Sequence, residues 1–461
     1  MQLLGWILAL LTPPLAYAFA HAAGLSDQAS IFAGLMLATL LFWVFRLVDE
    51  FVAPLIAVTG SLFVGLAPPE VALSGFASPS MLLLVGVFAL SAIISSSGLS
   101  YRLILALLIR LPDQPIWHQL SLLLSGYALS PFVPSANTRI SLLSPAFTSI
   151  VSALRLPSGG PGITALLAAL FSGARLFGPM MVTSRSFNIA AINFLPDQLR
   201  LEFNGIFWLI AACVALMVVT AAHLILTAWL FRPPIPVHLP REDLEQSLDE
   251  LGPLSPLEAT AAFCFLLFAL GSATIGWHHV EAHVLAGCVL LALLISTAIN
   301  KHDFRRAIDW PQIWFLMGID CMVRIMDHLG LQQSLALALH DDFGFIHGNI
   351  FLFVVAALAV TLLLRLVLPV TAGAVSATVI LLPIAETNAI NPWIAVFCAT
   401  MFTDIAFFRY QGTNGLLQLY SDGLIDVAQE RLFIVHSLWI NVALVLGVLA
   451  SIPWWYSLGI L

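Results

Sequence analysis

Apolar runs long enough to cross a lipid bilayer recur along almost the whole chain. A membrane-spanning helix needs about 20 consecutive apolar residues. Of the 461 residues, 60% are hydrophobic and only 9% are charged, whereas soluble domains carry roughly 25% charged residues. A segment inside lipid must satisfy its own backbone hydrogen bonds, so runs of this length predict helices. We therefore expect an all-α polytopic membrane protein.

The apolar runs predict about eleven transmembrane helices. Two of them are longer than a single crossing requires, which predicts an interruption within each. The expected spans lie near residues 3–22, 29–47, 52–68, 80–97, 162–195 (overlong), 204–232, 257–274, 281–299, 312–329, 392–423 (overlong) and 433–458.

The placement of Lys and Arg predicts the orientation, because positive residues favour cytoplasmic loops. With the N-terminus inside, only Arg200 falls in an outer connection. Eleven spans then leave the C-terminus outside, and we expect a bacterial cytoplasmic (inner) membrane. The residues placed on the cytoplasmic side are Arg46, Arg102, Arg110, Arg155, Arg232, Arg241, Lys301, Arg305, Arg306 and Arg431.

A short polar segment from Pro134 to Arg139 separates two apolar runs, 120–129 and 140–156. Each run is too short to cross a bilayer comfortably, and Pro131 and Pro134 break any helix that continues through them. This pattern predicts a re-entrant hairpin over 119–155. Its polar tip is tolerated at membrane depth only where it lines a cavity or is buried in protein.

Arg139 lies just after that tip, inside the returning half-helix. A cation at this depth costs on the order of 3 kcal/mol on insertion scales. The helix N-terminus beside it is already positive. Two positive features placed together predict that an anion binds at this tip.

The two halves of the chain resemble each other. Residues 80–108 align with 313–339, and LLSPAF at 142–147 aligns with LLPIAE at 381–386. Five expected crossings separate the aligned copies, and an odd number inverts the second copy. Inverted repeats with broken helices are typical of secondary transporters, whose substrate site lies at the repeat interface. Short apolar matches also arise by chance, so an accidental likeness stays as the alternative.

The predicted division follows from this repeat. It has an N-terminal helix at 1–28, a first inverted repeat at 29–232 (hairpin 119–155, broken helix 162–195), a cytoplasmic linker at 233–256, and a second repeat at 257–461 (hairpin 346–388, broken helix 392–423).

Four irregular segments stand out within the apolar sequence: two hairpin tips and the middles of the two overlong spans. At such breaks, freed carbonyl and hydroxyl oxygens can coordinate Na⁺, and half-helix N-termini can receive an anionic group. The alternative is a Gly/Pro kink repaired by Ser and Thr side chains. The segments are 135–139, 371–376, 178–188 and 409–415.

The sequence resembles the divalent anion–sodium symporter (DASS) family of the ion transporter superfamily. The resemblance runs from about residue 40 to the end. It is carried by Ser97-Gly98-Leu99 with Arg102-Leu103 ahead of the first hairpin, Asn137-Thr138 before Leu142-Leu143-x-Pro145, and Ile308-Asp309-Trp310-Pro311. It implies eleven spans, two re-entrant hairpins, an elevator mechanism and a homodimer. It also implies transport of dicarboxylates, tricarboxylates or sulfate, with Na⁺ or by exchange.

The resemblance can be carried to individual residues. Asn137-Thr138 matches the Ser-Asn-Thr motif of the family's tips, and Gly412-Thr413-Asn414 matches its Gly-Thr-Pro-Pro-Asn-like turn without the prolines. It therefore implies candidate Na⁺ positions at Asn137, Gly412 and Asn414, with no other cofactor. The second tip, Gly373-Ala374-Val375, and the first break, Thr183 to Ser186, depart from these motifs.

Arg139, Arg185 and Arg409 fall in or beside three of the four irregular segments. Our hypothesis is that fixed guanidinium groups replace the charge of Na⁺ and accept an anion bidentately. This favours Na⁺-independent exchange or H⁺ coupling, with Asp404 as the candidate proton carrier. The candidate substrate-binding residues are Ser135, Asn137, Thr138, Arg139, Ser184, Arg185, Thr371, Gly373, Arg409, Thr413 and Asn414.

The alternative for these arginines is a structural one, because intramembrane charges usually pair. They would then pair with buried acids such as Asp404 or Glu386. Arg365 is a further candidate partner of Asp404. Asp320 and Arg324, one helical turn apart, predict an ion pair. A metal site at His278, His279 and His283 rests on spacing alone, which is weak.

The predicted function is secondary active transport of a small divalent anion across a lipid bilayer. The alternative is a cation/H⁺ antiporter or metalloid-type exporter of the same superfamily, against which the arginines argue. The sequence carries no HExxH motif and no nucleophile elbow, so an enzyme is not expected. A structural scaffold with a decayed transporter fold is a further alternative. The net charge of −8 gives no support to nucleic-acid binding.

Overall fold

The computed structural model describes residues 2–154, 156, 160–203, 205–231, 241–334, 344–405 and 427–461. Within these residues the secondary structure is helical, with no strand, which confirms the predicted all-α class. Eight helices of the described chain are long and apolar enough to cross a membrane. Shorter apolar helices such as α20 and α22 add to these, and the count of eleven spans stays a prediction.

The first half of the chain contains α1 (Gln2–Ala22), α2 (Asp27–Val44), α3 (Val52–Val64), α4 (Pro69–Ala72), η1 (Ser74–Ala77), α5 (Pro79–Ser97), α6 (Leu99–Arg110), α7 (Pro115–Leu129), α8 (Ala136–Ala153), α9 (Pro161–Arg175), η2 (Gly178–Met180), η3 (Val182–Ser184), α10 (Ser186–Ala191), η4 (Ile192–Phe194), α11 (Asp197–Phe203) and α12 (Ile206–Leu230).

The second half contains α13 (Arg241–Glu250), α14 (Pro256–Ala273), α15 (Ile275–His278), α16 (Ala282–Ile295), α17 (Lys301–Ala307), α18 (Trp310–His328), η5 (Gly344–Ile346), α20 (Ile350–Arg365), α21 (Val370–Thr387), α22 (Pro392–Thr403) and α24 (Val427–Ser457).

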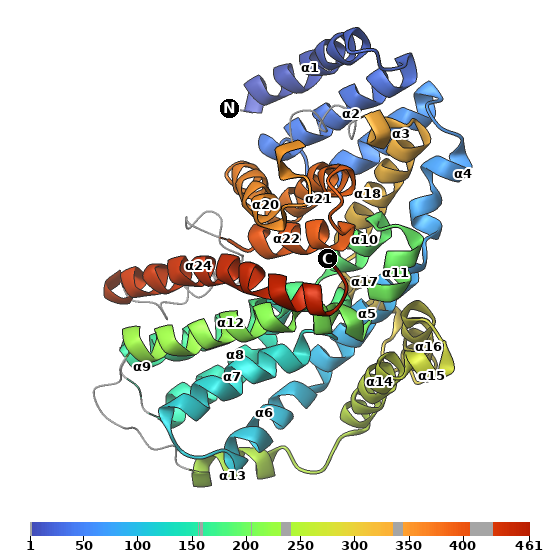
Figure 1. Cartoon of the computed structure of the whole chain (residues 1–461). Coiled ribbons are helices and arrows are strands. Elements are labelled where there is room, and N and C mark those ends of the chain that lie inside the picture. Colours follow the sequence, from blue (N-terminus) through green and yellow to red (C-terminus); the bar gives the residue numbers. More distant parts are fainter. Residues whose placement is uncertain are drawn as a thin grey trace.

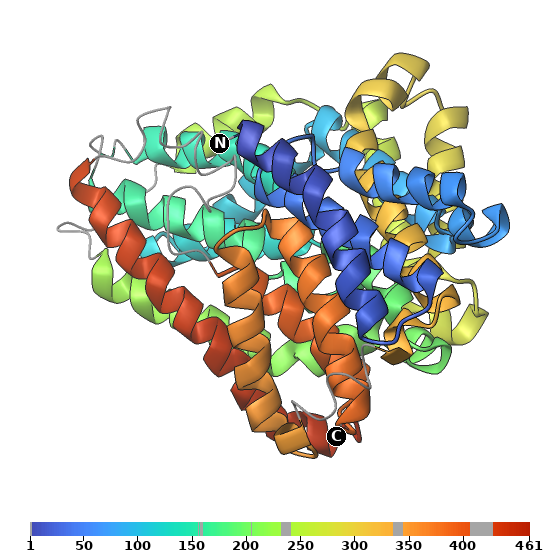
Figure 2. The ribbon, with the colours of Figure 1, turned by 90° about the horizontal axis from the view of Figure 1, so that it is seen from above.

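Figure 1 shows how the helices are arranged. The pair α1 and α2 lies at one end, and α13, α14 and α16 lie toward the other. Helices α12 and α24, from different halves of the chain, run side by side. Helices α20, α21 and α22 pack together in the middle, and the view from above keeps α20 and α21 adjacent (Figure 2).

Local sequence explains where these helices begin. Proline occupies the first turn of α5, α7, α9, α14 and α22, where its missing N–H costs no hydrogen bond. Ser255 and Glu258 form a reciprocal capping box at α14. Helix boundaries in this apolar chain are thus set by a few prolines and polar caps.

Both predicted hairpins are helix–turn–helix units. Helices α7 and α8 join through a turn that contains Pro131 and Pro134, and Ser135 caps α8 by accepting the Thr138 N–H at 3.3 Å. Helices α20 and α21 join through a turn that ends at Pro369. Arm α7 crosses α9 at close range, since a Cβ on Gly126 would lie 2.3 Å from the Gly173 carbonyl carbon.

The segment of the first overlong span, 162–195, contains more than one helix. Helix α9 ends at Arg175, two 3₁₀ turns follow, and α10 starts at Ser186. The Asn188 amide donates to the carbonyls of Gly178 and Met181, each at 2.9 Å, so the irregular backbone is partly satisfied from within. In the second overlong span, α22 ends at Thr403 with Asp404 as its C-cap.

In the described part of the polar linker, α13 packs against α6. Arg102 of α6 binds the segment that follows α13: its Nε donates to Glu258 Oε1 of α14 at 2.7 Å, and its Nη1 donates to the Gly252 carbonyl at 2.8 Å. The predicted Asp320–Arg324 ion pair is also present, at 3.2 Å. Among the described residues, no group of three or more His, Cys, Asp or Glu side chains is placed to hold a metal ion.

Candidate functional site

A cavity of about 900 Å³ lies where the two hairpin tips meet. Its wall includes residues 134–137 of the first tip, 368–371 of the second tip, and 185–187 of the first break. These segments come from opposite halves of the chain. The cavity is therefore lined by the tips of both hairpins and by the first break.

The cavity wall combines aromatic, cationic and anionic side chains. Trp43, Phe88 and Phe187 supply its apolar surface. Its charged and strongly polar members are Arg46, Asp49, Glu50, Asn137, Arg185, Asp309, Gln312 and Arg365. Arg46 and the adjacent acids belong to the connection between α2 and α3 and are exposed, so the cavity reaches solvent at that end.

Four of the predicted site residues lie on this wall: Ser135, Asn137, Arg185 and Thr371. The other described candidates, Thr138, Arg139, Ser184 and Gly373, are not part of the lining. Predictions at Arg409, Gly412, Thr413 and Asn414 lie outside the described residues, so the Na⁺ positions there stay predictions.

Arg139 is 1% exposed and lies behind the cavity wall. Its Nε donates to the Ala174 carbonyl at 2.7 Å and its Nη1 donates to the Ser184 carbonyl at 2.9 Å. Nη1 also donates to the carbonyl of Val133. A cation near the C-terminal end of a helix is favoured by the helix dipole. The structure thus places Arg139 as a link between the tip, the end of α9 and the break, rather than at the cavity surface where the sequence predicted it.

Arg365 makes the corresponding contacts in the second hairpin. Its Nε donates to the carbonyl of Thr403, the last residue of α22, at 3.0 Å, and its Nη1 donates to the Leu368 carbonyl at 2.9 Å. Leu368 directly precedes the tip proline, Pro369, as Val133 precedes Pro134. Sequence reasoning missed this role because the acceptors are backbone carbonyls, which leave no mark in the sequence.

Asp404, the C-cap of α22, links that helix to the end of α9 and to the first break. Its carboxylate lies 2.5 Å from Arg185 and 3.4 Å from Arg175, and its own carbonyl accepts from Arg175 at 2.9 Å. Arg185 also donates to the Thr400 carbonyl at 3.2 Å. The alternative in which these arginines pair with buried acids such as Asp404 therefore describes the contacts of Arg185, and Arg175 is a second partner of Asp404 that the sequence did not single out.

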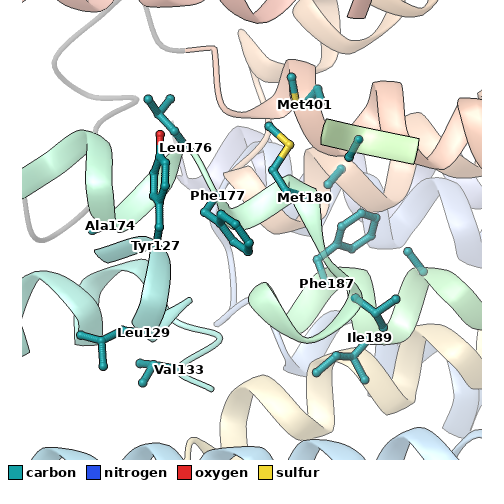
Figure 3. Close-up of a cluster of buried hydrophobic side chains, with 14 of the residues drawn as sticks. Tyr127, Leu129, Val133, Ala174, Leu176, Phe177, Met180, Phe187, Ile189 and Met401 are labelled. Atoms are coloured by element: carbon teal, nitrogen blue, oxygen red, sulfur yellow. The ribbon is translucent and has the colours of Figure 1, made fainter. Parts of the chain in front are cut away.

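Among the described residues, Arg139, Arg175 and Arg185 all lie close enough to Asp404 to interact with its carboxylate electrostatically, so this group of four side chains carries more positive than negative charge. A cluster of buried hydrophobic side chains packs around the same segments (Figure 3). This cluster includes Tyr127, Leu129, Val133, Ala174, Leu176, Phe177, Met180, Phe187, Ile189 and Met401. The backbone at the break is therefore surrounded by packed apolar side chains, while hydrogen bonds and ion pairs hold the arginines.

Comparisons with known proteins agree with this architecture. A family model described as "Citrate transporter" (CitMHS) matches residues 40–403. The inner membrane protein YbhI of Escherichia coli is 24% identical over 353 residues, covering 73% of each chain. A putative malate transporter of Bacillus subtilis, YflS, is 24% identical over 282 residues, covering 60% of this chain and 58% of that protein.

Two solved transporters share the fold. The YdaH transporter of Alcanivorax borkumensis superposes with a TM-score of 0.53 at 18% identity, over 89% of this chain and 90% of its own. MtrF of Neisseria gonorrhoeae, described as one of a class of antimetabolite efflux pumps, gives a TM-score of 0.53 at 13% identity, over 87% and 84%. Since the family match spans most of the sequence, the chain belongs to the CitMHS citrate transporter family, within the ion transporter superfamily that its motifs predicted.

Proposed function

We propose that the protein is a secondary active transporter of small di- or tricarboxylates of the citrate and malate type. Family membership supports transport of an organic anion. The observation that carries the proposal is the single cavity that both tips and the first break share, with Arg185, Asn137 and Thr371 on its wall. Guanidinium, amide and hydroxyl groups are the donors that carboxylates accept.

The size of the cavity fits this class of cargo. Small-molecule sites enclose roughly 300–1,000 Å³, and the cavity measures about 900 Å³. Its exposed end carries Arg46, which the charge distribution predicts on the cytoplasmic side. We infer that this conformation is open to the cytoplasm, and that an elevator movement of the tips and broken helices exposes the cavity to the other side.

Coupling without an obligatory Na⁺ is part of the proposal. Among the described residues, the three cations Arg139, Arg175 and Arg185 outnumber the one carboxylate of Asp404 at the first break. Fixed positive charge lowers the need for a co-bound cation beside an anionic substrate. We therefore expect exchange or H⁺ coupling. A homodimer and an Na⁺ ion at Asn137 remain proposals that the family resemblance implies.

The test is counterflow in proteoliposomes loaded with unlabelled malate. We expect uptake of labelled citrate or malate, and we expect it to persist when choline replaces Na⁺. Arg185→Gln is expected to abolish uptake. The matched control is Arg305→Gln, which removes a positive charge from an exposed position on α17. Uptake that requires Na⁺ would contradict the coupling, and absence of counterflow with citrate, malate, succinate and sulfate would contradict the function.

A cation/H⁺ antiporter is the second candidate, because Asp49, Glu50 and Asp309 also line the cavity. Carboxylate oxygens are the ligands that hard cations prefer. One of these acids, Asp309, has a structural role, because it accepts the backbone N–H of Gln312 at 3.1 Å and caps the N-terminus of α18. Cation-dependent dissipation of a pH gradient in the same proteoliposomes, without anion counterflow, would favour this candidate.

A further inference from the structure

Helix α2 ends in a left-handed turn with an arginine where glycine is usual. The Leu47 N–H donates to the Phe42 carbonyl at 3.0 Å, and the Arg46 N–H donates to the Trp43 carbonyl at 3.3 Å. This is the Schellman pattern of helix termination, in which the left-handed residue is most often Gly. Arg46 occupies that position with a φ of +49°.

The left-handed conformation is unfavourable for a residue that carries a Cβ. Four non-glycine residues with positive φ occur in the described chain: Arg46, His279, Thr297 and Ala389. Of these, Arg46 alone lines the cavity. Backbone strain of this kind is concentrated at functional sites. An arginine at a position that favours glycine therefore suggests that its side chain has a function.

The connection that carries Arg46 is held in place. Trp43 is 4% exposed, and its Nε1 donates across the connection to the Glu50 carbonyl at 3.0 Å. The Trp43 ring also packs against Phe315, with ring centroids 5.8 Å apart. The Arg46 side chain is therefore presented to the cavity from a fixed backbone.

The guanidinium group of Arg46 differs from those of the other cavity arginines. Arg185 and Arg365 both donate to protein acceptors. Arg46 is exposed, and within the part of the chain that the structure describes, its side chain forms no hydrogen bond or salt bridge. Glu50 lies close enough to interact with its charge. Arg46 thus keeps its donors available to an incoming anion.

We propose that Arg46 is a substrate-binding residue that takes one carboxylate of the anion while the first break and the tips take another. This inference rests on the proposed function. Arg46 and Arg185 come from separate elements of the wall, α2 and the first break. Two cations on separate elements select an anion with at least two carboxylates over a monocarboxylate.

The test is Arg46→Gly, which removes the guanidinium group and the backbone strain together. We expect the KM for citrate or malate counterflow to rise about tenfold or more, the effect of losing one charge-assisted hydrogen bond. The melting temperature without ligand is expected to stay unchanged or rise, because glycine suits the left-handed turn. Arg46→Lys, which keeps the charge, is expected to give an intermediate KM.

Two controls separate charge from backbone. Thr297→Gly makes the same backbone exchange at an exposed site outside the cavity, where φ is +56°. It is expected to raise the melting temperature and leave KM unchanged. Arg305→Gln removes one exposed positive charge elsewhere and is expected to change neither quantity.

Each outcome bears on the inference. Wild-type counterflow with an unchanged KM in Arg46→Gly overturns it and leaves the proposed function standing. A melting temperature well below wild type in Arg46→Gly assigns the residue a structural role and overturns it too. Wild-type protein that shows neither counterflow nor a rise in melting temperature with any carboxylate overturns the proposed function together with the inference.

Discussion

The two hairpins place an arginine in the same set of contacts from opposite arms. Arg139 lies at the start of the returning helix α8, and Arg365 lies at the end of the entering helix α20. Each donates to the carbonyl before the tip proline and to a carbonyl in the last turn of the helix that follows the hairpin, α9 for Arg139 and α22 for Arg365. In both hairpins, carbonyl groups at a buried helix end need a hydrogen-bond donor, and a cation is favoured there. The arginine that meets this need comes from the returning arm in the first hairpin and from the entering arm in the second.

The two arginines differ in their access to the cavity. Arg139 is sealed at 1% exposure behind the wall, whereas Arg365 is 4% exposed and forms part of the wall. Loss of the first would leave buried carbonyls in a dry environment. Loss of the second would leave carbonyls beside a cavity that water can enter, so the first hairpin should depend more strongly on its arginine.

The largest expected effect is that of Arg139→Met. Three buried carbonyls lose a charged donor, each worth roughly 1.5–3 kcal/mol. We expect the free energy of unfolding to fall by about 4 kcal/mol or more, measured by thermal unfolding in detergent together with the yield of monodisperse protein. Arg139→Lys should recover part of this loss. A melting temperature close to wild type would show that the carbonyls find other donors.

Asp404→Asn is expected to come next. It removes the carboxylate that Arg175 and Arg185 share, and breaking a buried ion pair from one side costs roughly 3–5 kcal/mol. We expect the free energy of unfolding to fall by an amount near the lower end of that range, because the backbone carbonyl of Asp404 still accepts a hydrogen bond from Arg175. Combining it with Arg175→Gln should cost less than the two single changes together. Strict additivity in thermal unfolding would contradict the shared pairing.

Arg365→Met is expected to cost about 2 kcal/mol, roughly half the effect at Arg139. Two described backbone carbonyls lose their donor, and water from the cavity compensates in part. The same unfolding measurement checks this value against Arg139→Met under identical conditions. An equal or larger loss at Arg365 would reverse the comparison between the hairpins.

The smallest effect is expected from a pair of glycine substitutions. A Cβ on Gly373 would lie 3.2 Å from Arg365 Cδ, and a Cβ on Gly178 would lie 3.8 Å from Arg139 Nη2. Gly373→Ala should lower the free energy of unfolding by about 1 kcal/mol or less, because Arg365 has little room to yield. Gly178→Ala should be neutral within about 0.5 kcal/mol. Melting temperatures of the two variants, measured side by side, test this order.

Much of the fold could be predicted because it follows from hydropathy and a few prolines. Pro131, Pro134 and Pro369 marked both tips, and Gly178-Pro179 marked the first break. The Asp320–Arg324 pair followed from helical spacing alone. These features depend on neighbours in the sequence, and such neighbours are visible without a structure.

The roles of the arginines could not be assigned in the same way. Arg139 was predicted to meet the substrate, but its acceptors are carbonyls that the tertiary fold brings together. Arg46 was placed in a cytoplasmic connection by the charge distribution, yet that connection lines the cavity. Charge and approximate depth are readable from sequence, whereas the partner of a charge depends on packing between distant segments.

The crossing of α7 over α9 has a mechanical consequence. Backbone meets backbone where Gly126 faces Gly173, with no space for even a methyl group. A movement of α7 relative to α9 would have to separate two backbones in direct contact, so this close packing predicts that the two helices move together.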